Sequence, residues 1–343
     1  MYETFFGLRE RPFDLTPNPR FLLMTPTHRE ALANLQYGLS ARKGLTVLIG
    51  EAGAGKTTLI RLALEEWGKA GHLVAHLSNP SLTRGEFFEY LATAFDLAPG
   101  VGSSKARFLA EFTALVTRRH EDGLITGLVI DEAQSLSDEL LEEVRLLVNI
   151  ETPTEKLFQV LLVGQPELGT RLNQPDLRQI KQRIALRCTL ATLDVRQVAA
   201  YVAGRIQIAG GVAAQVFTRE AVMAIHQHSG GIPRVISVIS DNALLAGFAA
   251  GTRPVTSTMV DGVCREFDIQ RSATSGEDQF ETVTAGRVPQ PHAASEPAVA
   301  GARPARGAGQ RPPAGHKTEK DPAEVGGLFQ QYVAAGKRRF SFF

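Results

Sequence analysis

A glycine-rich stretch between an apolar run and an amphipathic run is the first feature with the composition of a reactive site. Residues 45–49 read LTVLI, and the following letters, GEAGAGKT, fit the phosphate-loop pattern G-x-x-x-x-G-K-[ST]. Because glycine has no Cβ, Gly50, Gly53 and Gly55 allow the loop to curl until its amide N–H groups point at a polyphosphate. The next helix adds the positive end of its dipole. The stretch therefore predicts a nucleotide site.

Two residues of this loop have the chemistry to do more than bind phosphate through the backbone. Lys56 is expected to reach the β- and γ-phosphates, and the Thr57 hydroxyl to hold Mg²⁺. The alternative is a glycine-rich turn without a ligand, which the Lys-Thr pair and both flanks disfavour. The residues expected to contact the nucleotide here are consecutive: Gly50, Glu51, Ala52, Gly53, Ala54, Gly55, Lys56, Thr57 and Thr58.

A pair of carboxylates ends a second apolar run, LITGLVIDEAQ at residues 124–134. Open α/β sheets bind ligands at the carboxyl ends of their strands. Asp131 is therefore expected to hold Mg²⁺, through water, and Glu132 to orient and deprotonate the attacking water. We expect the alternation of side chains along a strand to separate the two roles. The alternative is a solvated strand end, since Asp-Glu pairs are common in turns.

Polar residues further along the chain are candidates for sensing the γ-phosphate. Gln165 follows the apolar run 157–163, where it is expected to meet that phosphate or the attacking water; the alternative is a turn residue before proline. Arg234 begins a helix after the break SGGIP and is expected to point across the cleft at the same phosphate. An exposed arginine in a first helical turn is the alternative, although the helix dipole disfavours it there.

The stretch LRQIKQRIALR at residues 177–187 holds candidates for an arginine finger, which stabilises charge on the transferred phosphoryl group in a neighbouring subunit. The candidates are Arg178, Arg183 and Arg187. A basic helix exposed to water is the alternative.

Alternating strand and helix patterns predict the elements that position these residues. We expect an α/β domain over residues 45–193 and an all-helical domain over 194–270. Residues 1–44 are expected to pack on the ATPase core, with a helix that Thr27 caps together with Glu30. The helix at 137–150 is expected to expose Glu142, Glu143 and Arg145 on a solvated face.

Composition limits the remaining possibilities. The 343 residues carry a net charge of +1 and two cysteines without metal-site spacing, which gives no general attraction to nucleic acid and fits a reducing cytosol. No signal peptide or membrane span is expected, so the protein is expected in the cytoplasm. Residues 271–325, rich in Ala, Pro, Gly and Arg, are expected to be disordered. Residues 326–343 are a basic and aromatic tail. We expect it either to contact a partner or the inner face of an anionic membrane, or to be a frayed end without a role.

Several motifs taken together resemble one family. MYETFFGLRERPFDLTPNPRFLL, THREAL, GEAGAGKTT, LVIDEAQ, LLVGQPEL and SGGIPR are similar to segments of the ExeA-type ATPases of the AAA+ superfamily, which includes general secretion pathway and exosortase-associated ATPases. The resemblance covers residues 1–270. It implies a P-loop α/β domain with a parallel sheet flanked by helices, a small helical lid, ATP hydrolysis with Mg²⁺, and a homo-oligomer. It puts Gln165 at the sensor-1 position, Arg234 at sensor 2 and Arg183 at the finger.

The resemblance also has a departure and leaves alternatives. Secretion-type members continue into a membrane helix and a periplasmic peptidoglycan-binding domain, which this sequence does not show, so the shorter exosortase-associated kind is favoured. The expected function is a conformational motor or switch for an envelope-associated secretion, exopolysaccharide or protein-sorting assembly. A DNA-handling helper ATPase of a transposition system is a second hypothesis, which the near-neutral charge disfavours. A nucleotide-binding adaptor without turnover is a third, which Glu132 disfavours.

Overall fold

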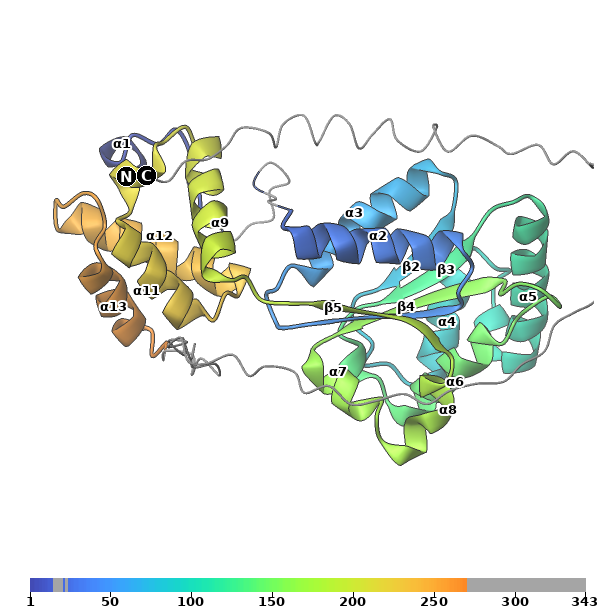
Figure 1. Cartoon of the computed structure of the whole chain (residues 1–343). Helices are drawn as coiled ribbons and strands as arrows, with labels where there is room; N and C mark the ends of the chain where they lie inside the picture. The colour runs from blue at the N-terminus through green and yellow to red at the C-terminus, as the bar shows by residue number, and fades with distance from the viewer. Residues whose placement is uncertain (15–20, 22–23, 270–343) are drawn as a thin grey trace, which may run out of the picture. The chain divides into compact units, whose positions relative to one another are not determined.

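The computed structural model describes residues 1–14, 21 and 24–269 (Figure 1). The expectations for residues 271–325 and 326–343 fall outside the described residues. In the described part, the chain forms a parallel α/β domain followed by a domain built of helices, as the sequence pattern predicted.

A five-stranded parallel sheet in the order β2-β3-β4-β1-β5 forms the centre of the α/β domain. The strands are β1 (Leu45–Gly50), β2 (Leu73–Leu77), β3 (Thr126–Ile130), β4 (Phe158–Gly164) and β5 (Ile184–Leu190). Every residue of β1, β3 and β4 is buried, because a parallel sheet is covered on both faces and its inner strands are apolar on both sides. All five strands point the same way, so β1, β3 and β4 bring the phosphate loop, Asp131 and Gln165 to one edge.

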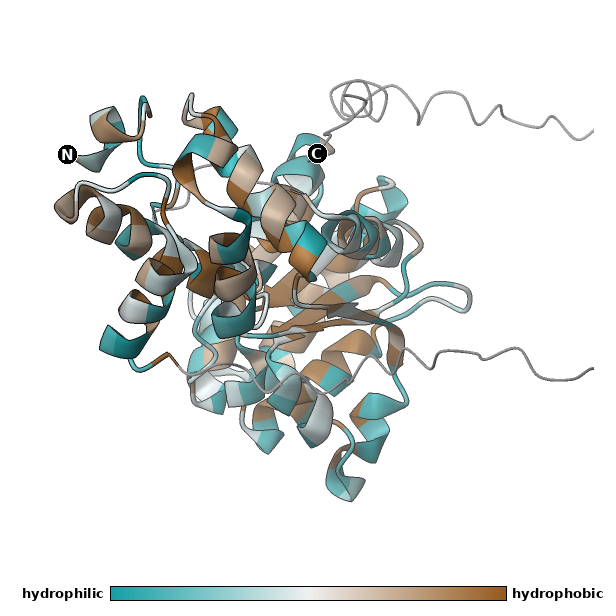
Figure 2. Ribbon diagram, turned by 60° about the vertical axis from the view of Figure 1, so that its left-hand side comes forward, coloured by the Kyte–Doolittle hydropathy of each residue, from teal (hydrophilic) through white to brown (hydrophobic). Residues whose placement is uncertain are grey.

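Helices cover the two faces of this sheet, and Figure 2 shows the apolar strands in brown between helices whose outer surfaces are largely teal. One face is covered by α2 (Pro26–Ser40) and α3 (Lys56–Lys69). The other face is covered by α4 (Arg84–Ala94), α5 (Lys105–Glu121), α6 (Asp138–Val148), α7 (Pro166–Arg171) and α8 (Arg178–Lys181). On that second face, the Phe108 and Phe112 rings stack with centroids 5.2 Å apart.

The helical domain has its own apolar core. Its helices are α9 (Val195–Ile208), α10 (Ala213–Val216), α11 (Arg219–Ser229), α12 (Pro233–Ala249) and α13 (Ser257–Glu266). Asp194 caps α9 in a capping box with Gln197, and Gly230 ends α11 in a left-handed conformation.

The beginning of the chain belongs to this helical core, and the expectation that all of residues 1–44 pack on the ATPase core is wrong. The short helix α1 (Tyr2–Phe5) and the side chains of Phe6, Phe13 and Phe21 are buried with residues of α9 to α13. The Tyr2 hydroxyl also donates a hydrogen bond to Asp241 of α12. Periodicity carries no information about which of two cores the apolar residues at the start of the chain join.

The first residue of α2 is Pro26, and Thr25 rather than Thr27 is its N-cap. The Thr25 hydroxyl accepts a hydrogen bond from the His28 amide at 3.3 Å. Proline in the first helical turn needs no amide partner and favours a helix start at this point. The expected capping box with Glu30 is therefore wrong, and the cap places His28, three residues after Thr25, on the inner face of the helix.

Glu143 is buried, and the expectation that it lies on a solvated face of α6 is wrong. Its side chain is 4% exposed, whereas that of Glu142 is 51% exposed. The Glu143 carboxylate pairs with Lys105 of α5 at 2.7 Å and with Arg84 of α4. A buried carboxylate needs such partners to offset its desolvation. Glu143 therefore joins three helices on one face of the sheet.

We predict that Glu143→Gln lowers the free energy of unfolding by about 1–2 kcal/mol, because the two cations lose their common carboxylate. Glu142→Gln is the matched control. It removes an exposed (i, i+3) pair with Arg145 and should change stability by less than about 0.5 kcal/mol. Urea denaturation followed by circular dichroism measures both values, and equal losses would contradict the structural role of Glu143.

Candidate functional site

The loop between β1 and α3 curls because two of its glycines adopt left-handed backbone angles. Gly53 has φ = 80° and Gly55 has φ = 101°, which L side chains rarely adopt. Gly50 is needed for a different reason. A Cβ at this last residue of β1 would lie 3.1 Å from the carbonyl oxygen of Leu190 on the neighbouring strand β5. The three glycines thus serve two purposes, loop curvature and close strand packing.

The Lys56 ammonium group lies within this loop. Lys56 is 5% exposed, and its Nζ donates hydrogen bonds to the carbonyl oxygens of Gly50 at 2.8 Å and Glu51 at 3.0 Å. Burial is the largest influence on this group and lowers its pKa below the ordinary value of lysine, while the carboxylates of Glu132 and Asp131 act in the opposite direction. A buried cation beside curled amides suits a polyanionic ligand.

Thr57 and Asp131, the two expected metal ligands, are in direct contact. The Thr57 hydroxyl donates to Asp131 Oδ2 at 3.0 Å, and Asp131 is buried at the end of β3. In the described ranges no group of three or more His, Cys, Asp or Glu side chains is placed to hold a metal. A pair of oxygen ligands fits Mg²⁺, which usually keeps several waters and takes its other ligands from substrate phosphates.

Glu132 lies outside strand β3, which ends at Ile130, so the expected separation of roles by strand alternation is wrong. Instead Glu132 has a left-handed backbone with φ = 51°. Its amide donates to Asp131 Oδ1 at 3.0 Å, so the two carboxylates are fixed relative to each other by this turn. A non-glycine residue in this conformation is uncommon and is found repeatedly at functional sites.

Two glutamine side chains hold the Glu132 carboxylate. Gln165 Nε2 donates to Glu132 Oε2 at 3.0 Å, and Gln134 Nε2 donates to the same oxygen at 2.5 Å. Gln134 Oε1 in turn accepts from the Gln165 amide at 3.1 Å, which fixes the orientation of the Gln134 side-chain amide. The bond from Gln165, followed by that from Gln134, lowers the pKa of Glu132 below its ordinary value, against the effect of its partial burial.

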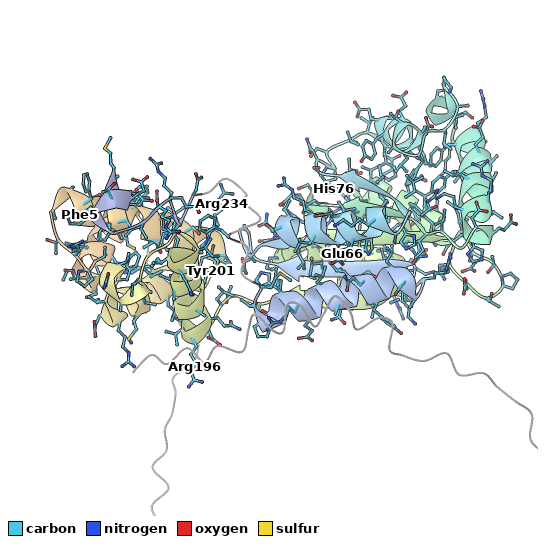
Figure 3. All side chains as sticks on the ribbon, turned by 90° about the horizontal axis from the view of Figure 1, so that it is seen from above. Phe5, Glu66, His76, Arg196, Tyr201 and Arg234 are labelled. Atoms are coloured by element: carbon cyan, nitrogen blue, oxygen red, sulfur yellow. The ribbon has the colours of Figure 1, made fainter. Side chains whose placement is uncertain are left out.

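The first residues of α12 approach the loop from the helical domain. The Arg234 amide donates to the Gly53 carbonyl oxygen at 3.3 Å, and a Cβ at Gly53 would lie 2.7 Å from Arg234 Cβ. The Arg234 side chain, labelled in Figure 3, is exposed. The structure thus brings Arg234 to the loop through its backbone.

The arginines of residues 178–187 do not join this cluster. Arg183 is exposed and precedes β5, in which Ile184 pairs with Leu45 and Leu190 with Gly50. Arg183 is therefore at the end of the sheet opposite the phosphate loop, about 20 Å away at the usual rise per residue of a strand. Arg178 begins α8, and Arg187 lies midway along β5 with its guanidinium group close to Gly169.

Comparison with known proteins agrees with this geometry. Residues 40–172 match the AAA domain family. The chain is 42% identical over 255 residues to general secretion pathway protein A of Aeromonas hydrophila, an alignment that covers 74% of this chain and 46% of that protein. The chain belongs to the ExeA-type AAA+ family. It therefore spans about half the length of this ExeA-type relative.

Solved structures show the same fold as this ExeA-type chain. Cdc6p from Pyrobaculum aerophilum aligns with 18% identity and a TM-score of 0.56 over 74% of this chain and 70% of the other. The Aeropyrum pernix ORC2 protein aligns with 20% identity and a TM-score of 0.52 over 75% and 71%. In the described residues, no helix is sufficiently long and apolar to span a bilayer.

Two residues of the site escaped the sequence interpretation of this ExeA-type chain. Gln134 belongs to the IDEAQ motif, but its position in the sequence does not indicate a contact with Glu132. That contact depends on the left-handed turn at Glu132. Arg171 at the end of α7 donates to the carbonyl oxygens of Gln134, at 2.9 Å, and Leu136. A basic residue in a last helical turn is ordinary, so no signal distinguished it.

We predict that Gly53→Ala lowers the free energy of unfolding by at least about 1–2 kcal/mol, because alanine is strained at φ = 80° and its Cβ meets Arg234. Gly68→Ala is the control. Gly68 lies in α3 with no atom within 4 Å of its added Cβ, and the change should stabilise by up to about 1 kcal/mol. Urea denaturation of both variants tests whether the free energy of unfolding falls in Gly53→Ala and rises in Gly68→Ala. An unchanged free energy of unfolding in Gly53→Ala would contradict the close approach of α12.

Proposed function

We propose that this chain is a Mg²⁺-dependent ATPase that acts as a conformational motor or switch for an envelope-associated secretion, exopolysaccharide or protein-sorting assembly. The observation that carries this proposal is the pair of hydrogen bonds by which Gln134 and Gln165 orient the Glu132 carboxylate. This carboxylate lies at the same sheet edge as Lys56 and Thr57. A site that only bound nucleotide would have no need of an oriented carboxylate beside the phosphate loop.

The two glutamines leave one oxygen of Glu132 for chemistry. Both amide donors bind Oε2, and Oε1 has no hydrogen bond to the described part of the chain. In the proposed step, Oε1 accepts a proton from a water molecule as the water oxygen attacks the γ-phosphorus. The bond between the γ-phosphorus and the β,γ-bridging oxygen breaks, and ADP and phosphate are released. A lowered pKa keeps Glu132 ionised before the transfer.

The other residues bind and orient the substrate. The amides of residues 50–58 and the Lys56 ammonium group bind the phosphates, and Thr57 and Asp131 hold the metal. Bound Mg²⁺ would neutralise part of the charge that develops on the phosphate oxygens. Gln165 acts as sensor 1 through its bond to Glu132, and Arg234 acts as sensor 2 from the start of α12.

Arg183 completes the site of a second copy of the chain. Because it is exposed and about 20 Å from its own phosphate loop, it can act only on a neighbour, as an arginine finger does. This arrangement requires a homo-oligomer. The exposed arginines of α8 and β5, which include Arg178 and Arg187, would then face the neighbouring subunit.

The assembly served is proposed from the relative, whose name refers to the general secretion pathway. We propose that the chain works in the cytoplasm, at the inner face of the membrane that holds its partner. Residues 326–343, with their basic and aromatic composition, are proposed as a contact to that partner or to anionic lipid.

We predict that Glu132→Gln leaves Mg-ATP binding within about threefold of wild type and lowers kcat by at least about 100-fold, because the amide cannot accept the proton of water. Glu142→Gln makes the same chemical change on the exposed face of α6 and should leave kcat unchanged. Calorimetric binding and phosphate release measure the two quantities. Unchanged turnover in Glu132→Gln would remove the basis of the hydrolysis proposal.

We predict that Arg183→Ala and Lys56→Ala are each inactive alone and that their mixture regains part of the wild-type activity. In a mixed oligomer, an intact phosphate loop on the Arg183→Ala chain meets an intact finger on the Lys56→Ala chain. Phosphate release is measured across a range of mixing ratios and total concentrations. Activity in isolated Arg183→Ala would show that Arg183 is no finger, and failure of the mixture would argue against a shared site.

A further inference from the structure

His28 contacts the phosphate loop from the first turn of α2. It is 6% exposed. Its Nε2 is 3.1 Å from the carbonyl oxygen of Ala54, and 3.0 Å from the position that a Cβ on Gly55 would take. The imidazole therefore packs directly on the peptide that joins Ala54 to Gly55.

The direction of this hydrogen bond is determined by its partners. A carbonyl oxygen only accepts, so His28 Nε2 carries the proton and donates it to Ala54. His28 Nδ1 is then the acceptor for the Thr25 hydroxyl, 2.5 Å away. Thr25 is also the N-cap of α2 and accepts from the His28 amide. Burial lowers the pKa of His28 below its ordinary value, which favours this neutral form.

The geometry of a peptide bond converts the contact into an effect on phosphate binding. In a planar trans peptide the C=O and N–H bonds point in opposite directions. A carbonyl of Ala54 that points at His28 therefore turns the Gly55 N–H away from α2, towards the inside of the loop. The amides of a phosphate loop bind their ligand with this inward orientation.

We propose that His28 is a positioning residue of the nucleotide site, and that its hydrogen bond to Ala54 keeps the Gly55 amide directed at the phosphates. The inference rests on the proposed ATPase function for its ligand, but the loop contact itself does not. His28 acts through Ala54 and takes no part in proton transfer. The adjacent Gly53 carbonyl is held by the Arg234 amide of α12, so two consecutive loop carbonyls are held by donors from different helices.

The position of His28 is itself well fixed. Ala54 is 2% exposed and packs in the same apolar cluster as Leu35 and Leu39 of α2. Gln36 of α2 donates to Glu66 of α3, which Figure 3 labels. The helix that carries His28 is therefore tied to the helix that follows the loop.

The test compares His28→Gln with His28→Asn in the full chain. Both are amides, but only the longer glutamine side chain places a nitrogen where His28 Nε2 lies and reaches Ala54. Hydrogen–deuterium exchange without nucleotide reports on loop residues 50–58. We expect exchange at least tenfold faster than wild type in His28→Asn, and exchange within about threefold of wild type in His28→Gln. Glu30→Gln, on the exposed side of α2, is the control and should behave as wild type.

Nucleotide affinity separates positioning from a general loss of structure. We expect His28→Asn to raise the KM for Mg-ATP at least tenfold and to leave kcat at saturation within about threefold, because Glu132 and Gln165 are untouched. His28→Gln should restore KM. Equal exchange in the two amide variants, or a KM unchanged in His28→Asn, would overturn the proposal. Faster loop exchange in His28→Asn than in His28→Gln, together with a wild-type chain that binds no ATP, would instead contradict the proposed function and leave the positioning role of His28 supported.

Discussion

The candidate site depends on the backbone conformation of the loop between β1 and α3, residues 51–55, which curls at Gly53 and Gly55. Such a conformation places carbonyl oxygens on the outer side of the loop, where each needs a donor. The Gly53 carbonyl is met by the Arg234 amide and the Ala54 carbonyl by His28, while the Gly50 and Glu51 carbonyls accept from Lys56. The Gly53 and Ala54 carbonyls are thus held from outside the loop, by Arg234 and His28, whereas Lys56 lies inside it.

The Glu132 carboxylate is likewise held by donors around it. Glu132 is held by amide donors from the turn after β3 and from the end of β4, and Arg171 of α7 fixes the turn that carries Gln134. None of these donors needs to touch the nucleotide. A parallel sheet brings the ends of β1, β3 and β4 to one edge, but the hydrogen bonds between the loops that follow these strands decide the direction of each reactive atom.

The fold was predictable from the sequence because it follows from local patterns, and the candidate site residues were proposed from local patterns as well. Strands at 45–50 and 126–130, the glycines of the loop and the Asp131-Glu132 pair are each visible in a short window. The errors concern residues whose environment depends on distant contacts. The helical pattern puts Glu143 on the polar side of α6. In the structure it pairs with Arg84 and Lys105, which lie more than 30 residues earlier in the sequence, on other helices. Nothing in the sequence THREAL distinguishes His28, because its contact with Ala54 exists only in the folded chain.

The division of the N-terminal segment between two cores has a mechanical consequence. Phe6, Phe13 and Phe21 are buried with the helical domain, whereas Thr25 and His28 begin the helix that packs on the α/β domain. The start of the chain thus contacts both domains, and His28 belongs to the part that packs on the α/β domain. The helical domain also reaches Gly53 through Arg234. Arg234 and His28 therefore hold consecutive carbonyls of the loop from the two domains, so a change in the position of the helical domain would act on the Gly53 carbonyl, next to the one that His28 holds.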